Sequence, residues 1–184
     1  REGGTGLLQA AWVRPLGNGQ QERVMPDFTH VPGEGLRVHL DIDEARLLRE
    51  VCGEMKTLLE ADIPRADPVM QRLFPDAFED PTEAENFREL IGGDLHAHKL
   101  DALRTVTERL GPCGPLDSSI PEDEIEAWLT LLTDIRLAIG VRLDITEDRM
   151  ASDIHPADPD APALSVLHWL GWLQGSILEA LESP

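Results

Sequence analysis

One arginine interrupts an apolar stripe in the stretch "WLTLLTDIRLAIGVRL", which runs from Trp128 to Leu143. Apolar residues recur there at helical spacing, and Arg136 occupies a position where a leucine would be expected. A guanidinium stays charged inside a protein, so it needs carboxylates or carbonyl groups around it. The favoured interpretation is a structural ion pair. The alternatives are a ligand-binding arginine and a side chain that reaches out to solvent.

Three polar residues on another predicted helix are the candidate partners of Arg136. Asp94, His98 and Asp101 share one helical face, at positions i, i+4 and i+7. A pair between Arg136 and Asp94 or Asp101 would fix the register of two helices. The same three side chains could also ligate a metal. No HExxH motif or second Glu-x-x-His segment accompanies them, so the sequence predicts no metal site and no cofactor.

Redox chemistry would need one of the two cysteines, Cys52 and Cys113. Cys52 lies on the apolar stripe of a predicted helix, where a cysteine is an inert small hydrophobe. Cys113 lies in the loop sequence "GPCGP" and is expected to be exposed. The two do not form a CxxC motif, and a disulfide between them is left open. Oxidation of Cys113 or an intermolecular bridge is the other redox route.

Catalytic motifs are missing from the sequence. It contains no GxSxG, P-loop or GxGxxG pattern, so we predict that the chain is not an enzyme. Trp169 and Trp172 point to neighbouring sides of the last predicted helix. They are either core aromatics or interface residues, as at a homodimer contact.

The charge balance narrows the choice of partners. The 184 residues include 35 Asp and Glu against 16 Lys and Arg, a formal net charge of −19. This excess disfavours unaided binding to nucleic acid and to anionic membranes. It suits a basic protein partner, or it serves solubility alone. No apolar run of about 18 residues is present and no secretion signal is visible, so we expect a cytoplasmic protein without a membrane span.

Capping and periodicity predict four main helices. Asp41 with Glu44 begins the first helix, Asp80 begins a helix over 81–110, and Asp160 caps the last one. The stretch after Pro121 forms another helix, and residues 68–74 form a short one. Gly92 and Gly93 interrupt the long helix, but its apolar phase continues, so one helix is expected, with glycines that let a neighbour approach closely. Residues 111–120 read as a turn-rich link, and 144–160 as an acidic loop.

The N-terminal part has strand character. "GLLQAAWV" (Gly6–Val13) and "GLRVHLDI" (Gly35–Ile42) flank a loop rich in Gly and Pro that is expected to be mobile. The sequence therefore predicts a mainly α fold, a helical bundle of four main helices with a small N-terminal β-hairpin. We expect a single domain over 1–184, with the hairpin and its loop in 6–42 and the bundle in 43–184.

Three segments together resemble a known family. They are "PVMQRLFPDAFEDPTEAENFREL", "WLTLLTDIRLAIGVRLDITED" and "HWLGWLQGSILEAL". They are similar to an actinobacterial family labelled as a domain of unknown function, some members of which are called AosR, the actinomycete oxidative-stress regulator. The resemblance covers most of residues 36–182. The positions that match its Asp-x-Arg, Gly-x-Arg-Leu and Trp-Leu-Gln patterns look architectural, and they are Asp134, Arg136, Gly140, Arg142, Leu143, Trp172, Leu173 and Gln174.

The resemblance implies a cytoplasmic helical regulator that responds to oxidants through cysteines and acts on transcription with a sigma factor as partner. Cys52 and Cys113 form no recognisable redox motif here, so the fold and the partner can be shared without the sensing chemistry. Two hypotheses follow. The chain is a redox-responsive transcription modulator working through protein–protein contacts, or an oligomeric structural or adaptor protein with no redox role.

Overall fold

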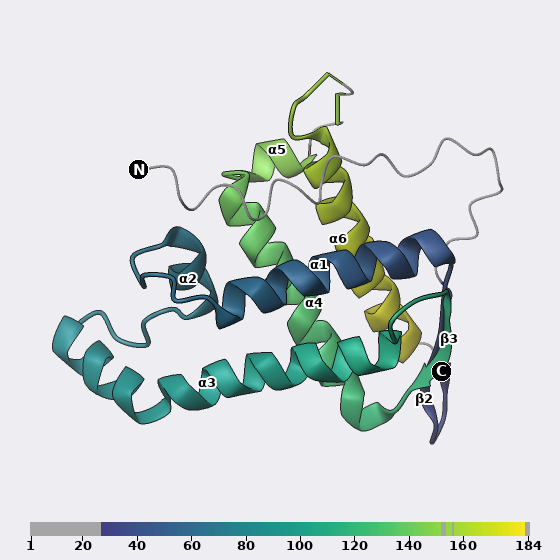
Figure 1. The fold of residues 1–184 in the computed structure, drawn as a ribbon, viewed down its shortest axis with the longest axis horizontal. Helices are drawn as coiled ribbons and strands as arrows, with labels where there is room; N and C mark the ends of the chain where they lie inside the picture. The colour runs from purple at the N-terminus through teal and green to yellow at the C-terminus, as the bar shows by residue number, and fades with distance from the viewer. Residues whose placement is uncertain (1–26, 152–153, 156, 183–184) are drawn as a thin grey trace.

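Four long helices form the body of the molecule, and a small sheet lies at one end of it (Figure 1). The computed structural model describes residues 27–151, 154–155 and 157–182. The long helices are α1 (Ile42–Glu60), α3 (Pro81–Leu110), α4 (Glu122–Arg142) and α6 (Ala161–Glu182), and the short ones are α2 (Pro68–Leu73) and α5 (Glu147–Ala151). The prediction of a mainly helical fold with four main helices is confirmed.

The sheet has three antiparallel strands, in the order β1 (Asp27–Val31), β2 (Gly35–Leu40) and β3 (Leu116–Ile120). β2 confirms the strand predicted near residue 35. β1 lies in the segment predicted to be a loop, and β3 lies in the link predicted to be turn-rich, so both of those expectations are wrong. The other predicted strand, Gly6–Val13, lies outside the described residues.

The third strand, β3, cannot be recognised from the sequence pattern, because only its two end residues are apolar. Leu116 pairs with Leu40, and Ile120 pairs with Leu36, so β3 is held by a strand more than seventy positions earlier. Its "LDSSI" sequence has no alternation, and tertiary pairing overrides the weak local preference. Gly35 permits the close approach, because a Cβ there would lie 2.1 Å from the carbonyl oxygen of Ile120.

Two predicted helix caps are present. The Asp41 side chain accepts hydrogen bonds from the backbone N–H groups of Asp43 and Glu44, and the Glu44 carboxylate accepts from the N–H of Asp41. Asp80 caps α3 in the same way through the N–H groups of its first turn. These bonds satisfy donors that have no partner inside a helix, and so they fix where α1 and α3 begin.

α3 continues through its glycine pair, as predicted. The expected reason for the glycines is wrong at Gly93, because an added Cβ there would meet no described atom within 4 Å. The acidic segment predicted as a loop contains the short helix α5. Five residues are too few to show a helical repeat, so sequence periodicity cannot reveal such an element.

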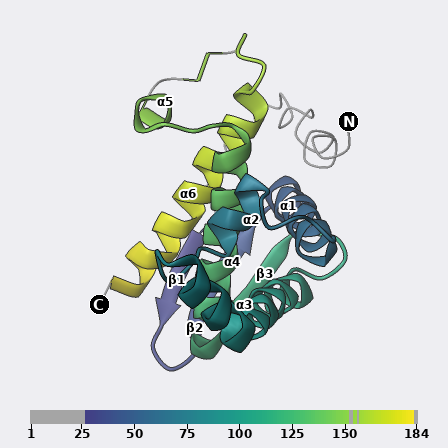
Figure 2. The same cartoon turned by 90° about the vertical axis from the view of Figure 1, so that its left-hand side faces the viewer.

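α4 is the centre of the fold. It packs against α3, α2, α6 and β2, and Trp128 near its start is fully buried. α6 lies beside α4 on the outer flank of the molecule, next to β1 (Figure 2). Among the described helices, none combines the length and apolar character that crossing a membrane requires.

Candidate functional site

The exposed thiol of Cys113 lies in the loop that joins α3 to β3. Gly111 and Gly114 flank it with φ angles of +61° and +83°, which residues with a side chain rarely adopt. The two glycines let the chain turn on both sides of Cys113. The predicted exposure of this cysteine is confirmed.

The guanidinium of Arg49 on α1 binds the backbone of the same loop. It donates hydrogen bonds to the carbonyl oxygens of Leu110 at 2.7 Å, Gly111 at 2.8 Å and Gly114 at 2.7 Å. Between 61 and 65 residues separate donor and acceptors, so the sequence gives no sign of the contact. The only general signal is the preference for basic side chains near helix C-termini. Arg49 thus ties the end of α3 and the Cys113 loop to α1.

Cys52 is buried in the core on α1, as predicted. Burial raises the pKa of its thiol to about 12, so the sulfur stays protonated at neutral pH. A thiol without solvent access and without thiolate character is a poor nucleophile. Both cysteines are free in this structure, and Cys113 is the one an oxidant can reach.

Among the residues that the structure describes, Arg136 forms no ion pair, so the expected pairing with a carboxylate is wrong. Its Nη1 donates to Oε1 of Gln174 on α6 at 2.6 Å, and Nε2 of Gln174 donates to Oγ1 of Thr133 at 2.8 Å. The guanidinium is half-buried and lies 3.4 Å from where a Cβ on Gly171 would be, so glycine makes room for it. Arg136 is therefore bound by a neutral amide at Nη1, while its buried Nε has no hydrogen-bond partner among the described residues. This polar cluster joins α4 to α6.

The three predicted partners of Arg136 lie elsewhere. Asp94, His98 and Asp101 are exposed on α3, and Asp101 pairs with Arg104 on its own helix. The expected pairing of Arg136 with Asp94 or Asp101 is thus wrong. In the part of the chain that the structure describes, no group of three His, Cys, Asp or Glu side chains is placed to hold a metal ion.

A buried ion pair does join α3 and α4, between Lys99 and Asp134. The Nζ–Oδ1 distance is 2.6 Å, and the side chains are 9% and 7% exposed. Burial raises the pKa of Asp134, while the hydrogen bond and charge of Lys99 lower it in part. This pair was not predicted from the sequence, although Lys99 interrupts the apolar stripe of its helix just as Arg136 does.

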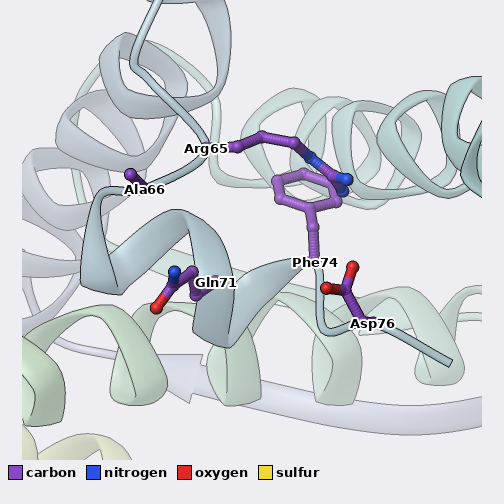
Figure 3. A pocket seen from close by; sticks show the side chains of 5 residues that line it. All are labelled: Arg65, Ala66, Gln71, Phe74 and Asp76. Atoms are coloured by element: carbon purple, nitrogen blue, oxygen red, sulfur yellow. The ribbon is translucent and has the colours of Figure 1, made fainter. Parts of the chain in front are cut away.

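A surface pocket of about 390 Å³ opens beside α2, and its lining residues are Arg65, Ala66, Gln71, Phe74 and Asp76 (Figure 3). Figure 3 shows the Arg65 side chain reaching toward the Phe74 ring. The same ring lies 5.7 Å from Nζ of Lys99, so the pocket and the buried ion pair share a wall. The lining offers charge, an amide and an aromatic surface, which are groups that suit recognition of a ligand.

The two predicted interface residues are both half-buried on α6. Trp169 and Trp172 pack partly against the core and leave the rest of each ring in solvent. The structure thus keeps the predicted site residues apart. Cys113 lies at the α3–β3 loop, Arg136 between α4 and α6, and the tryptophans on the outer flank of α6.

The chain is similar to mycobacterial proteins that are named as oxidative stress regulators. "Oxidative stress regulator AosR" of Mycobacterium tuberculosis strain H37Rv is 27% identical over 176 residues, which cover 77% of this chain and 80% of the relative. The protein of the same name from Mycobacterium bovis matches equally. "Putative oxidative stress regulator AosR" of Mycobacterium leprae is 30% identical over 129 residues, covering 62% of this chain and 58% of the relative.

No solved structure matches this chain. Residues 25–181 match the family described as "Domain of unknown function (DUF2017)". The match spans every helix and strand described above except the last residue of α6. The chain belongs to this DUF2017 family.

Proposed function

We propose that this chain is a redox-responsive modulator of transcription that acts through protein–protein contacts, with a sigma factor or another transcription component as partner. The observation that carries the proposal is the similarity, over most of the chain, to relatives named oxidative stress regulators. The exposed Cys113 supports it, because a thiol must reach solvent before a peroxide can attack it.

The sensing step needs only one thiol and an outside oxidant. The Cys113 thiolate attacks the O–O bond of hydrogen peroxide, an S–O bond forms, and hydroxide leaves and is protonated to water. The resulting sulfenic acid condenses with a second thiol, a disulfide forms, and a second water leaves. Cys52 is buried, so the second thiol comes from another molecule.

The charge of the chain supports a basic protein as partner. A net charge of −19 repels phosphate backbones and attracts cationic surfaces. We infer that the chain does not bind DNA unaided, is not an enzyme and works in the cytoplasm. The lack of catalytic sequence motifs and the separation of the candidate residues support the second of these.

An adaptor without a redox role is the second candidate. The observation that favours it is the burial of Cys52, which leaves Cys113 as the single reactive thiol in a chain with no intramolecular resolving partner. In that case the helices would serve only as a scaffold for assembly.

Co-purification from native lysate separates the two. The tagged chain and its Cys113→Ser variant are captured with and without brief peroxide exposure, and partners are identified by mass spectrometry. We expect a transcription component whose recovery changes with peroxide in the parent chain and not in the variant. If the amount of recovered partner changes neither with peroxide nor with the substitution, the adaptor hypothesis would be favoured. If transcription components are absent from every sample, the regulator hypothesis is wrong.

A further inference from the structure

The outer side of α6 carries a stripe of residues that the rest of the fold covers at most in part. Its members are spaced four, three and four residues apart, and we call Ser165, Trp169, Trp172 and Ser176 the α6 face. Ser165 is exposed and the other three are half-buried. The buried residues of α6 are others, namely Ala163, Leu164, Val166, Leu167, Leu170, Leu173, Ile177 and Ala180.

Two tryptophans on such a face are unusual for plain surface. Interfaces are enriched in tryptophan and depleted in charge, and buried tryptophans are frequent hot spots. Residues 161–178 contain no Asp, Glu, Lys or Arg, although 28% of the whole chain is charged. Partial packing of both rings against the core holds them in place, which lowers the cost of ordering them on binding.

The charge around the α6 face selects a cationic partner. α6 contains no Lys or Arg, and Glu179 and Glu182 lie exposed near its C-terminus. The carbonyl end of a helix carries partial negative charge, which these carboxylates increase. The exposed Glu182 lies ten residues beyond Trp172, or about 15 Å along the helix axis. A docked helix would place apolar anchors on the tryptophans and a cation toward this end of α6.

We propose that the α6 face docks an amphipathic, basic helix of a partner protein. This inference names the surface for the protein contact and rests on the proposed function. A second copy of the chain fits less well, because each copy carries a net charge of −19 and α6 contributes no cation to offset the repulsion. The apolar side of the partner helix covers the indole rings, and its lysines or arginines meet the acidic end of α6.

A model peptide tests the surface without knowledge of the partner. A dye-labelled amphipathic helix of leucine and lysine is titrated by fluorescence anisotropy at physiological salt, beside a peptide with glutamate in place of lysine. We expect the basic peptide to bind and the acidic one not to bind. Trp172→Glu should weaken binding by at least about tenfold. Pure charge attraction would instead strengthen binding, because this substitution makes the chain more negative.

Leu178 gives matched controls on the same helix. It is 45% exposed and lies off the α6 face, so Leu178→Glu should leave binding nearly unchanged. Ser165→Arg, at an exposed position, should weaken binding more than Leu178→Arg does. The comparison of Ser165→Arg with Leu178→Arg still tests the α6 face if the Trp172→Glu variant unfolds. Equal binding by the paired variants, or binding of both peptides, would overturn the proposal.

Analytical sedimentation of the chain without peptide tests whether a second copy of the chain occupies the α6 face. A dimer that Trp172→Glu dissolves would assign the α6 face to a second copy and overturn the basic-partner proposal. The proposed function can fail separately. Suppose that the basic peptide binds through the α6 face, but that partner recovery changes neither with peroxide nor with Cys113→Ser. The docking surface would then be supported, and redox control would be rejected.

Discussion

Asp134 and Arg136 stand two positions apart on α4 and bind different helices. Asp134 is paired with Lys99 on α3, and Arg136 donates to Gln174 on α6. Two residues along a helix are turned well away from each other, so one short Asp-x-Arg segment can serve two interfaces. The central helix is thereby tied in register to its neighbours on both sides.

Lys99→Met should destabilise the fold by about 3–5 kcal/mol at neutral pH, because it leaves the Asp134 carboxylate buried without its cation. The loss should shrink on acidification. Without Lys99 the pKa of Asp134 rises further, since the hydrogen bond and charge that lower it are gone. A carboxyl whose pKa is higher folded than unfolded weakens the fold above both values and not below them. Urea unfolding of parent and variant across pH measures this.

The exposed pair Arg104 and Asp101 provides the control for that experiment. Its side chains are 65% and 64% exposed, so Arg104→Met should cost less than about 1 kcal/mol. The double substitution of Lys99→Met with Asp134→Leu should recover part of the stability. A Lys99→Met loss that stays constant with pH would contradict the account of Asp134.

Arg136→Ala should cost about 1.5–3 kcal/mol, the range for a hydrogen bond to a charged group. This is less than the loss expected for a buried ion pair, because the acceptor in Gln174 is a neutral amide. A double-mutant cycle with Gln174→Ala should return a coupling of about 0.5–3 kcal/mol. Thermal or urea unfolding supplies the four stabilities. Independent, additive effects of the two substitutions would argue against the contact.

The helices could be predicted from the sequence because their signals are local. Caps such as Asp41 and Asp80 and long apolar repeats lie within single segments, and α1, α3, α4 and α6 follow from them. β3 could not be predicted, since its stability comes from pairing with a distant strand. Long-range partners limit strand prediction in this way wherever a strand lacks its own alternation.

The candidate site was predictable in part for the same reason. Exposure of Cys113 and burial of Cys52 follow from loop and helix context, and both are confirmed. The partner of Arg136 could not be predicted. A charged residue in an apolar stripe requires polar contacts, but the sequence does not show which helix supplies them. The Lys99 pair and the Arg49 contacts join segments whose relative placement the sequence does not give.

Arg49→Met should lower the free energy of unfolding by about 2–3 kcal/mol, because three carbonyl oxygens lose one charged donor. Arg46→Met is the matched control on the same helix. Arg46 makes ion pairs with Asp43 and Glu50 at a half-exposed surface, so its loss should cost less than about 1 kcal/mol. Hydrogen exchange should also show faster opening near Gly111 in Arg49→Met. Equal losses of unfolding free energy in the two variants would show that the Arg49 hydrogen bonds to the loop contribute little to stability.

Cys113 should react with a maleimide in the native chain, and Cys52 should react only after unfolding. Cys113 is exposed, whereas Cys52 has no access to solvent and burial raises its pKa to about 12. Intact mass should show one label on the folded parent chain, none on folded Cys113→Ser, and two on the parent in denaturant.

Brief peroxide exposure extends the same measurement to the redox step. Modification should map to Cys113, as a sulfenic acid or an intermolecular disulfide, and peptides that contain Cys52 should stay reduced. A Cys52–Cys113 disulfide would require the core to open first, since Cys52 is fully buried. If neither cysteine reacts until the chain unfolds, the thiol cannot be the sensor. The adaptor hypothesis would then be the better account of this chain.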